Sequence, residues 1–447
     1  IIGILAAVGA AVIPGLLENA KIKAVKANYN TIFKYVQAEV MKCEIGGEIE
    51  AHELFPTRYR GCDQPGSIRN FEQISGTVIA MLHSENQHIQ KIGNPFNKND
   101  KFYEAVESLE KISFEEKQIN FERLRVTTLA KCYDRTEDND KAFNYFTKAN
   151  NLFPQIRKVK YFDKNRYLEE IKIRRKFFKK STIEKWTTLK LSSKEPSPIF
   201  LIGFPRSGTT FLDTILRSHP LIEVIEEKFM VKKLIDSLSQ LPNGGLPGLK
   251  EIENDQLEKI RKTYFESLRL HIKNKNTSKL YIDKLPLNII HVGEIIRIFP
   301  DAKFIVSLRH PCDCVLSCFM QDFELNDAMA NFLNLDDAAH LYDAVMNLWT
   351  QYTSIFSINY HEVKYENLIA NFEPTVRSIL NFLELSWDDA VLEYLKTAKK
   401  RDRIATPSYS QVIKPIYSYA IGRWQRYRKQ TSNIYPILEG WIKKFNY

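Results

Sequence analysis

Cysteine is scarce in this sequence, and its few copies fit no metal site. Six cysteines among 447 residues are too few for a disulfide scaffold, although Cys43 and Cys62 could pair if the chain is exported. Cys312, Cys314 and Cys318 have an uneven spacing that matches no standard zinc site, and we interpret them as small residues at a turn and in the first turns of a helix. The sequence therefore predicts no metal.

Motifs that read nucleic acid are missing as well. We find no zinc-finger spacing and no RNP-like motif, so the net charge of +10 indicates anionic ligands or surfaces in general. The basic stretch 157–180 has aromatic residues between its charges and could form a platform for single-stranded nucleic acid. A solvated helix face with its aromatic side chains turned inward is the interpretation we favour. We therefore expect no nucleic-acid partner.

No apolar run reaches the roughly 20 residues of a membrane-spanning helix. Residues 1–17 are apolar apart from glycines and Pro14, and an amphipathic run continues to about Met41. This segment resembles the second half of the N-terminal helix of type IV pilins, and a signal-like or buried helix is the alternative. The resemblance implies membrane contact at the N-terminus, and we expect a cytoplasmic catalytic domain that this helix could anchor.

The length of 447 residues exceeds one typical core and predicts two or three domains. We assign residues 1–100 to the pilin-like segment, 101–195 to an α-helical region, and 196–447 to the catalytic domain. One TPR-type repeat fits the helical region, and its small and apolar positions are Val126, Leu129, Ala130, Tyr133, Ala142, Phe146, Ala149 and Pro154. Such a repeat is expected to pack on a neighbour or to offer a surface to a protein partner.

Residues 199–212 are the stretch around which the chain is organised. Four apolar residues predict a short buried strand, and a glycine-containing turn leads into an apolar-periodic helix. Gly203 and Gly208 have the spacing of a phosphate-binding loop, whose backbone N–H groups and helix N-terminus attract an anion. Thr209 stands where a nucleotide triphosphatase has lysine, and the positive charge comes from Arg206 inside the loop. The loop is therefore predicted to hold a terminal phosphate without the usual lysine.

Two further predicted strands end in basic residues. Residues 279–283 precede Lys284, and residues 302–308 precede Arg309. Alternating strands and helices favour an α/β fold with a parallel, doubly wound sheet, in which ligands bind beyond the carboxyl ends of the strands. The loop, Lys284 and Arg309 should thus converge on one edge.

The run Pro205-Arg206-Ser207-Gly208-Thr209-Thr210 resembles the phosphosulfate-binding loop of PAPS-dependent sulfotransferases, in the branch of tyrosylprotein sulfotransferases and bacterial TPR-sulfotransferases. The resemblance continues to the C-terminus. It implies the sulfotransferase fold, a P-loop-like parallel sheet flanked by helices, and PAPS as co-substrate without a metal. It also implies transfer of the sulfuryl group to an acceptor hydroxyl of a protein tyrosine, a carbohydrate or a small molecule.

The resemblance assigns roles to individual residues. PAPS carries a 5′-phosphosulfate and a 3′-phosphate and so needs two anion sites. The resemblance gives Arg206, Ser207, Gly208, Thr209 and Thr210 as the first site, and Arg309 and Ser317 as the second, for the 3′-phosphate. It also places Tyr365 near the nucleotide and Arg423 toward the 3′-phosphate. The catalytic residues are Glu227 as general base, Lys284 at the bridging oxygen, and Ser408 as its assistant, with Ser410 close by. The family's tyrosine-peptide branch has a peptide-binding arginine two residues after the base, where this chain has Phe229, so recognition of acidic tyrosine peptides is in doubt.

Two other functions stay open on the sequence. A P-loop kinase would transfer phosphate, although Thr209 occupies the lysine position and Asp283 is the only candidate Mg²⁺ ligand at a strand end. A pilin-like or TPR adaptor with an inactive transferase domain would have no activity. The intact set of charged motifs favours the sulfotransferase.

Overall fold

The computed structural model describes residues 119–156, 162–184, 197–272, 279–400 and 420–447, together with a few isolated positions. The predictions for residues 1–100 and for Ser408 lie outside these described residues. The chain divides into two compact units, Ile1–Val159 and Lys160–Tyr447.

The described part of the first unit is a pair of helices, α6 (Ile119–Arg135) and α7 (Asn139–Ile156). The side chains that close the pair are buried, and they are Val126, Leu129, Ala130, Tyr133, Ala142, Phe146 and Ala149. Three residues separate the helices, which is a typical length for a helical hairpin. The hairpin thus buries seven of the eight positions that the repeat pattern selected, while Pro154 is exposed, and its assignment to the TPR class stays a prediction.

The second unit is built on a five-stranded parallel sheet. Its strands are β1 (Ile199–Gly203), β2 (Ile222–Glu226), β3 (Leu280–Lys284), β4 (Lys303–Leu308) and β5 (Asn359–Lys364). They lie in the order β2-β3-β1-β4-β5, and every neighbouring pair is parallel. All five residues of β1 are buried, as expected for a central strand covered on both faces. The parallel sheet predicted from the sequence is confirmed.

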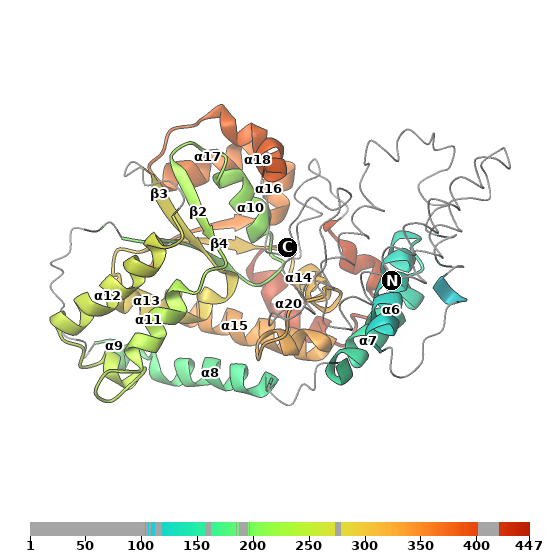
Figure 1. The fold of residues 1–447 in the computed structure, drawn as a ribbon, viewed down its shortest axis with the longest axis horizontal. Helices are drawn as coiled ribbons and strands as arrows, with labels where there is room; N and C mark the ends of the chain where they lie inside the picture. Colours follow the sequence, from blue (N-terminus) through green and yellow to red (C-terminus); the bar gives the residue numbers. More distant parts are fainter. Residues whose placement is uncertain are drawn as a thin grey trace, which may run out of the picture. The chain divides into compact units, whose positions relative to one another are not determined.

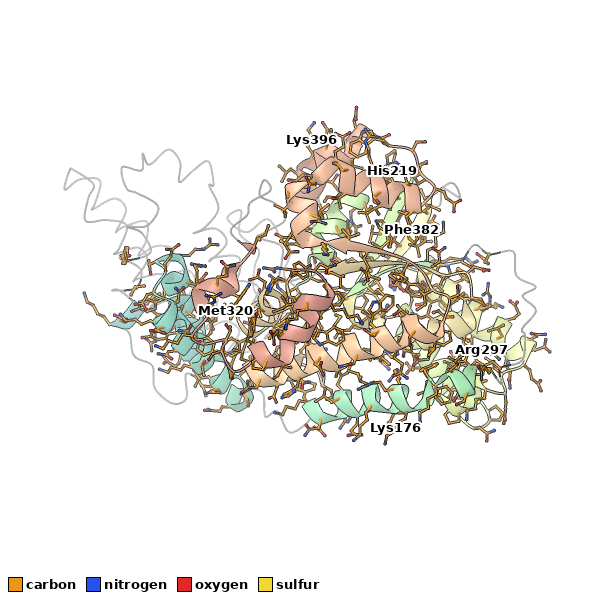
Figure 2. All side chains as sticks on the ribbon, turned by 180° about the vertical axis from the view of Figure 1, so that it is seen from behind. Lys176, His219, Arg297, Met320, Phe382 and Lys396 are labelled. Atoms are coloured by element: carbon orange, nitrogen blue, oxygen red, sulfur yellow. The ribbon has the colours of Figure 1, made fainter. Side chains whose placement is uncertain are left out.

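Helices cover both faces of the sheet (Figure 1). One layer holds α10 (Thr209–Leu216), α16 (Tyr365–Ala370), α17 (Phe372–Phe382) and α18 (Tyr394–Lys400). The other elements of the unit include α8 (Lys164–Phe177), α9 (Lys180–Ile183), α11 (Met230–Leu238), α12 (Asn254–Arg269), α13 (Val292–Ile298), α14 (Pro311–Phe319), α15 (Leu335–Ile355) and α20 (Tyr435–Lys444). Figure 2 shows the unit from behind, with Phe382 and Lys396 in the first layer and Lys176 and Arg297 on the other side.

Alternation along the central strands builds the two halves of the core. Ile199 and Leu201 belong to an apolar cluster with residues of α10 and α17. Phe200 points to the opposite face, where its ring stacks on Phe304 at 5.4 Å and lies 6.0 Å from the ring of Tyr264. Successive side chains of a strand point to opposite faces, so one short apolar run fills both halves.

Helix α8 packs with the sheet unit, although the sequence grouped it with the helical region before residue 196. Arg174 of α8 is buried and its Nε lies 2.8 Å from Oε1 of Glu294 on α13. The ring of Phe178, just after α8, lies 5.3 Å from the ring of Tyr352 on α15. A buried ion pair and an aromatic contact therefore tie this helix to the catalytic unit.

None of the helices within the described residues combines the length and the apolar character needed to cross a bilayer. The pilin-like segment lies outside those residues, and its membrane contact stays a prediction.

Candidate active site

The loop between β1 and α10 has a backbone that requires glycine at two positions. A Cβ on Gly203 would lie 2.5 Å from the carbonyl oxygen of Ser307. Gly208 has a φ of 103°, and a Cβ there would lie 2.6 Å from Cδ2 of Tyr365. Arg206 has a φ of 69°, which is uncommon for a residue with a side chain and often marks functional sites. The strand–loop–helix predicted from the sequence is present.

Side chains of β4, of α14 and of the turn between them form hydrogen bonds to the carbonyl oxygens of the loop. Ser307 Oγ donates to the carbonyl oxygen of Ser207 at 2.9 Å, and Arg309 Nη1 donates to that of Arg206 at 3.2 Å. Cys318 Sγ donates to the carbonyl oxygen of Pro205 at 3.3 Å. These three hydrogen bonds hold the backbone of the loop without using any group of a ligand.

Two buried donors of this site have no hydrogen-bond partner within the described part of the chain. They are Oγ of Ser207, whose residue is 1% exposed, and Nε of Arg309, whose residue is 7% exposed. A buried donor without a partner costs about 1–3 kcal/mol. Such donors fit an anionic ligand, whose oxygen atoms would accept these hydrogen bonds.

Lys284 lies at the end of β3 and is fully buried. Its Nζ donates to Glu227 Oε1 at 2.8 Å and lies 3.4 Å from Thr210 Oγ1 at the start of α10. The backbone N–H of Glu227 also donates to the carbonyl oxygen of Lys284 at 2.8 Å. The lysine therefore connects the proposed base to the first turn after the loop, and these three predicted residues come together.

Glu226 is a contact of Lys284 that the sequence did not predict. Its Oε1 lies 3.5 Å from Lys284 Nζ, because Glu226 is the partner of Lys284 in the register of β2 and β3. Two carboxylates therefore face one buried ammonium group, and Glu227 is the closer. The acidic pair in the sequence is the signal, but the register that selects both residues is visible only in the sheet.

The loop and the predicted 3′-phosphate residues form one continuous group. Arg206 Nε donates to Ser317 Oγ on α14 at 3.1 Å. The guanidinium of Arg309 lies over the ring of Tyr365 at 5.2 Å, and that ring packs against Gly208. The two anion sites expected from the sequence thus share a border formed by Arg206.

Arg423 is the first residue of the 3₁₀ helix η7 (Arg423–Tyr427). Arg309 donates from Nη2 to the carbonyl oxygen of Ala420, shortly before η7. The C-terminal segment therefore approaches the end of β4, where Arg309 lies. Ser408 is outside the described residues, so its predicted role stays a prediction.

Buried ionisable groups surround this edge. Burial raises the pKa of Asp283 to about 8, and its Oδ2 accepts a hydrogen bond from the Tyr264 hydroxyl at 3.2 Å. Burial also lowers the pKa of His310 to about 4, so that its ring is neutral at pH 7. Asp283 contacts the core instead of the phosphate edge, because neighbouring residues of a strand point to opposite faces. It is therefore a poor candidate for a Mg²⁺ ligand at the loop.

Phe229 follows the carboxylate pair and is 64% exposed. It precedes α11 and stands where the resemblance placed a peptide-binding arginine. An exposed phenyl ring offers an apolar contact in place of a charge.

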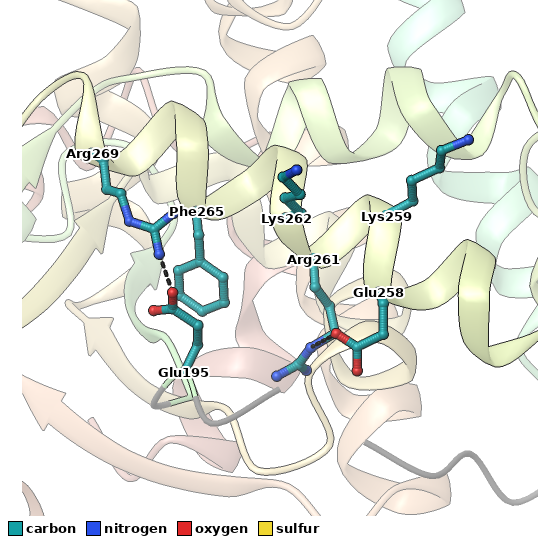
Figure 3. A pocket seen from close by; sticks show the side chains of 7 residues that line it. All are labelled: Glu195, Glu258, Lys259, Arg261, Lys262, Phe265 and Arg269. Carbon is teal, nitrogen blue, oxygen red and sulfur yellow. Dashed lines mark hydrogen bonds and ion pairs between the residues drawn. The ribbon is translucent and has the colours of Figure 1, made fainter. Parts of the chain in front are cut away.

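A separate pocket of about 360 Å³ lies along α12, and none of the predicted site residues lines it (Figure 3). Its lining consists of Glu195, Glu258, Lys259, Arg261, Lys262, Phe265 and Arg269. Arg269 forms an ion pair with Glu195, and Arg261 Nε lies 4.0 Å from Glu258. Its side chains largely pair with one another, and we assign the chemistry to the strand edge instead.

No group of three or more His, Cys, Asp or Glu residues that could hold a metal occurs among the residues with described positions.

Part of this chain is similar to known proteins. Residues 198–389 match the model of a family described as the sulfotransferase family. A protein of Aquifex aeolicus is 30% identical over 328 residues, which are 71% of this chain and 41% of that protein. Protein-tyrosine sulfotransferase 2 of Gallus gallus is 24% identical over 238 residues, 52% of this chain and 64% of that protein.

The chain therefore spans less than two thirds of the length of either relative. Among solved structures, the sulfotransferase domain of the Synechococcus PCC 7002 olefin synthase is similar with 21% identity and a TM-score of 0.37, over 54% of this chain and 91% of that one. The family match covers the loop, the carboxylate pair, Lys284, Arg309 and Ser317. Residues 198–389 of this chain are therefore similar to the sulfotransferase family.

Proposed function

We propose that this chain transfers the sulfuryl group of PAPS to an acceptor hydroxyl. The observation that carries the proposal is the contact of Lys284 with Glu227 at 2.8 Å and with Thr210 at 3.4 Å. A cation, a carboxylate and the first turn after an anion-binding loop meet at one point. Bound PAPS would supply an activated sulfuryl group and a phosphate leaving group.

The loop residues bind and orient the cofactor. Ser207 Oγ, Thr209, Thr210 and the N-terminus of α10 would hold the 5′-phosphosulfate, and the unpartnered Ser207 Oγ supports this assignment. Arg309 and Ser317 would hold the 3′-phosphate, and Arg206 lies between the two groups. Charge-assisted hydrogen bonds of this kind contribute roughly 1.5–3 kcal/mol each.

Glu227 would accept a proton, and Lys284 would stabilise the developing negative charge. Glu227 accepts the proton of the acceptor hydroxyl, and its side chain is 29% exposed, so an acceptor can reach it. Lys284 holds its positive charge at the oxygen that leaves with the phosphate, and its burial makes that charge more effective. Tyr365 supports the loop through its ring, and Ser408 is proposed to assist Lys284.

The acceptor is proposed to be a hydroxyl of a tyrosine, a carbohydrate or a small molecule. Tyrosyl peptides come first because several similar proteins are named protein-tyrosine sulfotransferases. Phe229 in place of a cation argues for testing neutral aromatic acceptors beside acidic peptides. Residues 101–195 are proposed to offer a surface to a protein partner, and residues 1–17 to contact a membrane.

The test of the cofactor is calorimetric titration of the full chain with PAP and, separately, with ADP and ATP. We expect PAP to bind and Arg309→Ala to weaken it, because the 3′-phosphate distinguishes PAP from the other nucleotides. Binding of ATP with no measurable binding of PAP would favour the kinase and refute the proposal. If PAP, ADP and ATP all fail to bind, the adaptor with an inactive transferase domain would be favoured.

The test of activity is transfer of labelled sulfate from PAPS to tyrosyl peptides, sugars and phenols. Lys284→Met is the test variant, because it removes the positive charge while keeping much of the side-chain length. We expect transfer by the wild type to at least one acceptor class and little transfer by the variant. Equal transfer by both proteins would remove Lys284 from the mechanism.

A further inference from the structure

Asp313 on α14 is a buried carboxylate to which the proposed mechanism gives no role. The residue is 1% exposed. Its Oδ2 accepts the backbone N–H of Gly422 at 2.7 Å, and its Oδ1 accepts that of Trp424 at 2.8 Å. Both carboxylate oxygens therefore bind a segment more than a hundred residues later in the chain.

These two N–H groups lie at the start of η7. A helix start leaves backbone N–H groups without partners, and a carboxylate is the strongest side chain to satisfy them. Gly422 is the N-cap residue and has a φ of 67°, which glycine adopts without strain. Arg423 lies between the two residues that Asp313 binds, so its backbone is held from both sides.

Other residues at the same strand–helix junction reinforce this attachment. Arg309 donates to the carbonyl oxygen of Ala420, and the ring of His310 stacks on Trp424 at 5.0 Å with an angle of 14°. Arg309 is also a proposed ligand of the 3′-phosphate. One short stretch therefore both binds the phosphate and fixes the segment that carries Arg423.

Charge supports the same role. Asp313 Oδ2 lies 3.9 Å from Nη2 of Arg309. Burial raises the pKa of Asp313, while the charges of Arg309 and Arg423 and the two N–H bonds oppose that rise. The carboxylate therefore attracts both guanidinium groups.

We propose that Asp313 is a positioning residue that sets Arg423 beside Arg309 for recognition of the 3′-phosphate of PAPS. The inference rests on the proposed function, since it assumes that PAPS is bound at this edge. Asp313 itself would touch no cofactor atom. It would act through the backbone of residues 422–424.

The first experiment needs no ligand. Amide hydrogen exchange of the cofactor-free chain is compared between wild type, Asp313→Asn and Asp313→Ala. An asparagine keeps the size but turns an N–H₂ group toward one of the two backbone donors, so at least one bond is lost. We expect residues 420–427 to exchange at least about tenfold faster in both variants, as the loss of a charge-assisted bond implies. Unchanged exchange there would overturn the attachment.

The second experiment compares PAP with 5′-AMP, which lacks the 3′-phosphate. We expect Asp313→Asn to weaken PAP binding about 10- to 100-fold and 5′-AMP binding less than about threefold. Arg423→Ala should give a similar selective loss, and the double variant should lose little more than the larger single loss, because both changes remove the same contact. The KM for PAPS should rise while kcat changes little.

Asp343→Ala is the matched control. Asp343 Oδ1 accepts from Nε1 of Trp441 on α20 at 2.8 Å, so it also binds the C-terminal segment but not the part with Arg423. Its PAP affinity should stay close to that of the wild type. Equal losses of PAP and 5′-AMP binding in Asp313→Asn, or fully additive losses with Arg423→Ala, would refute the positioning role. A wild type that binds no PAP would instead refute the proposed function, and the exchange experiment would still decide whether Asp313 holds the segment.

Discussion

The substitution Glu227→Gln tests the proposed division of labour between two adjacent carboxylates. Glutamine keeps the size of the side chain and can still accept a hydrogen bond from Lys284, which lies 2.8 Å from Glu227 Oε1. It cannot take a proton from an acceptor hydroxyl. The change therefore removes basicity with little change in shape.

The expected loss of turnover is about 10²–10⁴-fold, the usual share of a general base. PAP affinity should change by less than about threefold, since the carboxylate contacts neither proposed phosphate site. Lys284 is fully buried but keeps Glu226 Oε1 at 3.5 Å, so its charge stays partly compensated. We expect the free energy of unfolding to fall by about 1–2 kcal/mol from the weaker bond to Lys284.

Glu226→Gln is the matched variant, because it also removes one carboxylate from beside Lys284. The assay is sulfate transfer from labelled PAPS at saturating acceptor, with PAP titration and urea unfolding of each protein. We expect Glu226→Gln to keep turnover within about tenfold of the wild type, since its oxygen is the more distant and its role is charge balance. Inactivity of Glu226→Gln with normal turnover of Glu227→Gln would show that the base is Glu226. Normal turnover of both would refute a carboxylate base.

Three further predictions concern residues of the loop and of the strands beside it. Asp283→Asn should stabilise the fold increasingly as pH rises from about 4 to 8, because a folded-state pKa of Asp283 raised to about 8 makes the wild type lose stability through that window. Urea unfolding of both proteins at pH 5, 7 and 9 checks this, and a difference in their free energies of unfolding that stays constant with pH would contradict it. Arg206→Ala and Arg309→Ala should each weaken PAP binding by about 1.5–3 kcal/mol in calorimetry, and unchanged affinity in both would remove these residues from the site. Gly208→Ala should weaken PAP binding and lower the melting temperature, because the new Cβ would lie 2.6 Å from the Tyr365 ring at a φ of 103°; a variant that matches the wild type in both would show that the loop can shift.

The strand–loop–helix and the convergence of its partners were predictable from the sequence. The run 199–202 is apolar and short, and the spacing of Gly203 and Gly208 after it is typical of a phosphate-binding loop. Parallel strands end at a common edge, so the sequence alone predicts that Lys284 and Arg309 lie there. Local signals and one topological rule were enough for these residues.

Contacts between distant segments could not be predicted in the same way. Strand β5 has the sequence Asn-Tyr-His-Glu-Val-Lys and buries only Val363, as an edge strand can, so it shows no apolar run. The ion pair of Arg174 with Glu294 joins residues 120 positions apart, and nothing in the basic stretch around Arg174 indicates it. The bonds from Asp313 to Gly422 and Trp424 are equally distant, and Asp313 looks in the sequence like an ordinary acidic residue in a first helical turn.

The strand order explains how a loop without its own lysine can still have a lysine beside it. Strand β3 lies directly beside β1, so the residue that ends β3 faces the start of the helix that follows β1. Lys284 therefore reaches Thr210 from the neighbouring strand, while Thr209 keeps the loop position where a nucleotide triphosphatase has its lysine.

This position on β3 has a chemical consequence. Lys284 is also held by two carboxylates, Glu226 at the end of β2 and Glu227 directly after it. The proposed base, just after β2, and the proposed cation, at the end of β3, are therefore joined across two adjacent strands. When Glu227 takes a proton it becomes a weaker partner for Lys284, and the ammonium group becomes freer to bond the oxygen on which negative charge develops. In the proposed mechanism, deprotonation of the acceptor and stabilisation of the leaving group would be linked through one hydrogen bond.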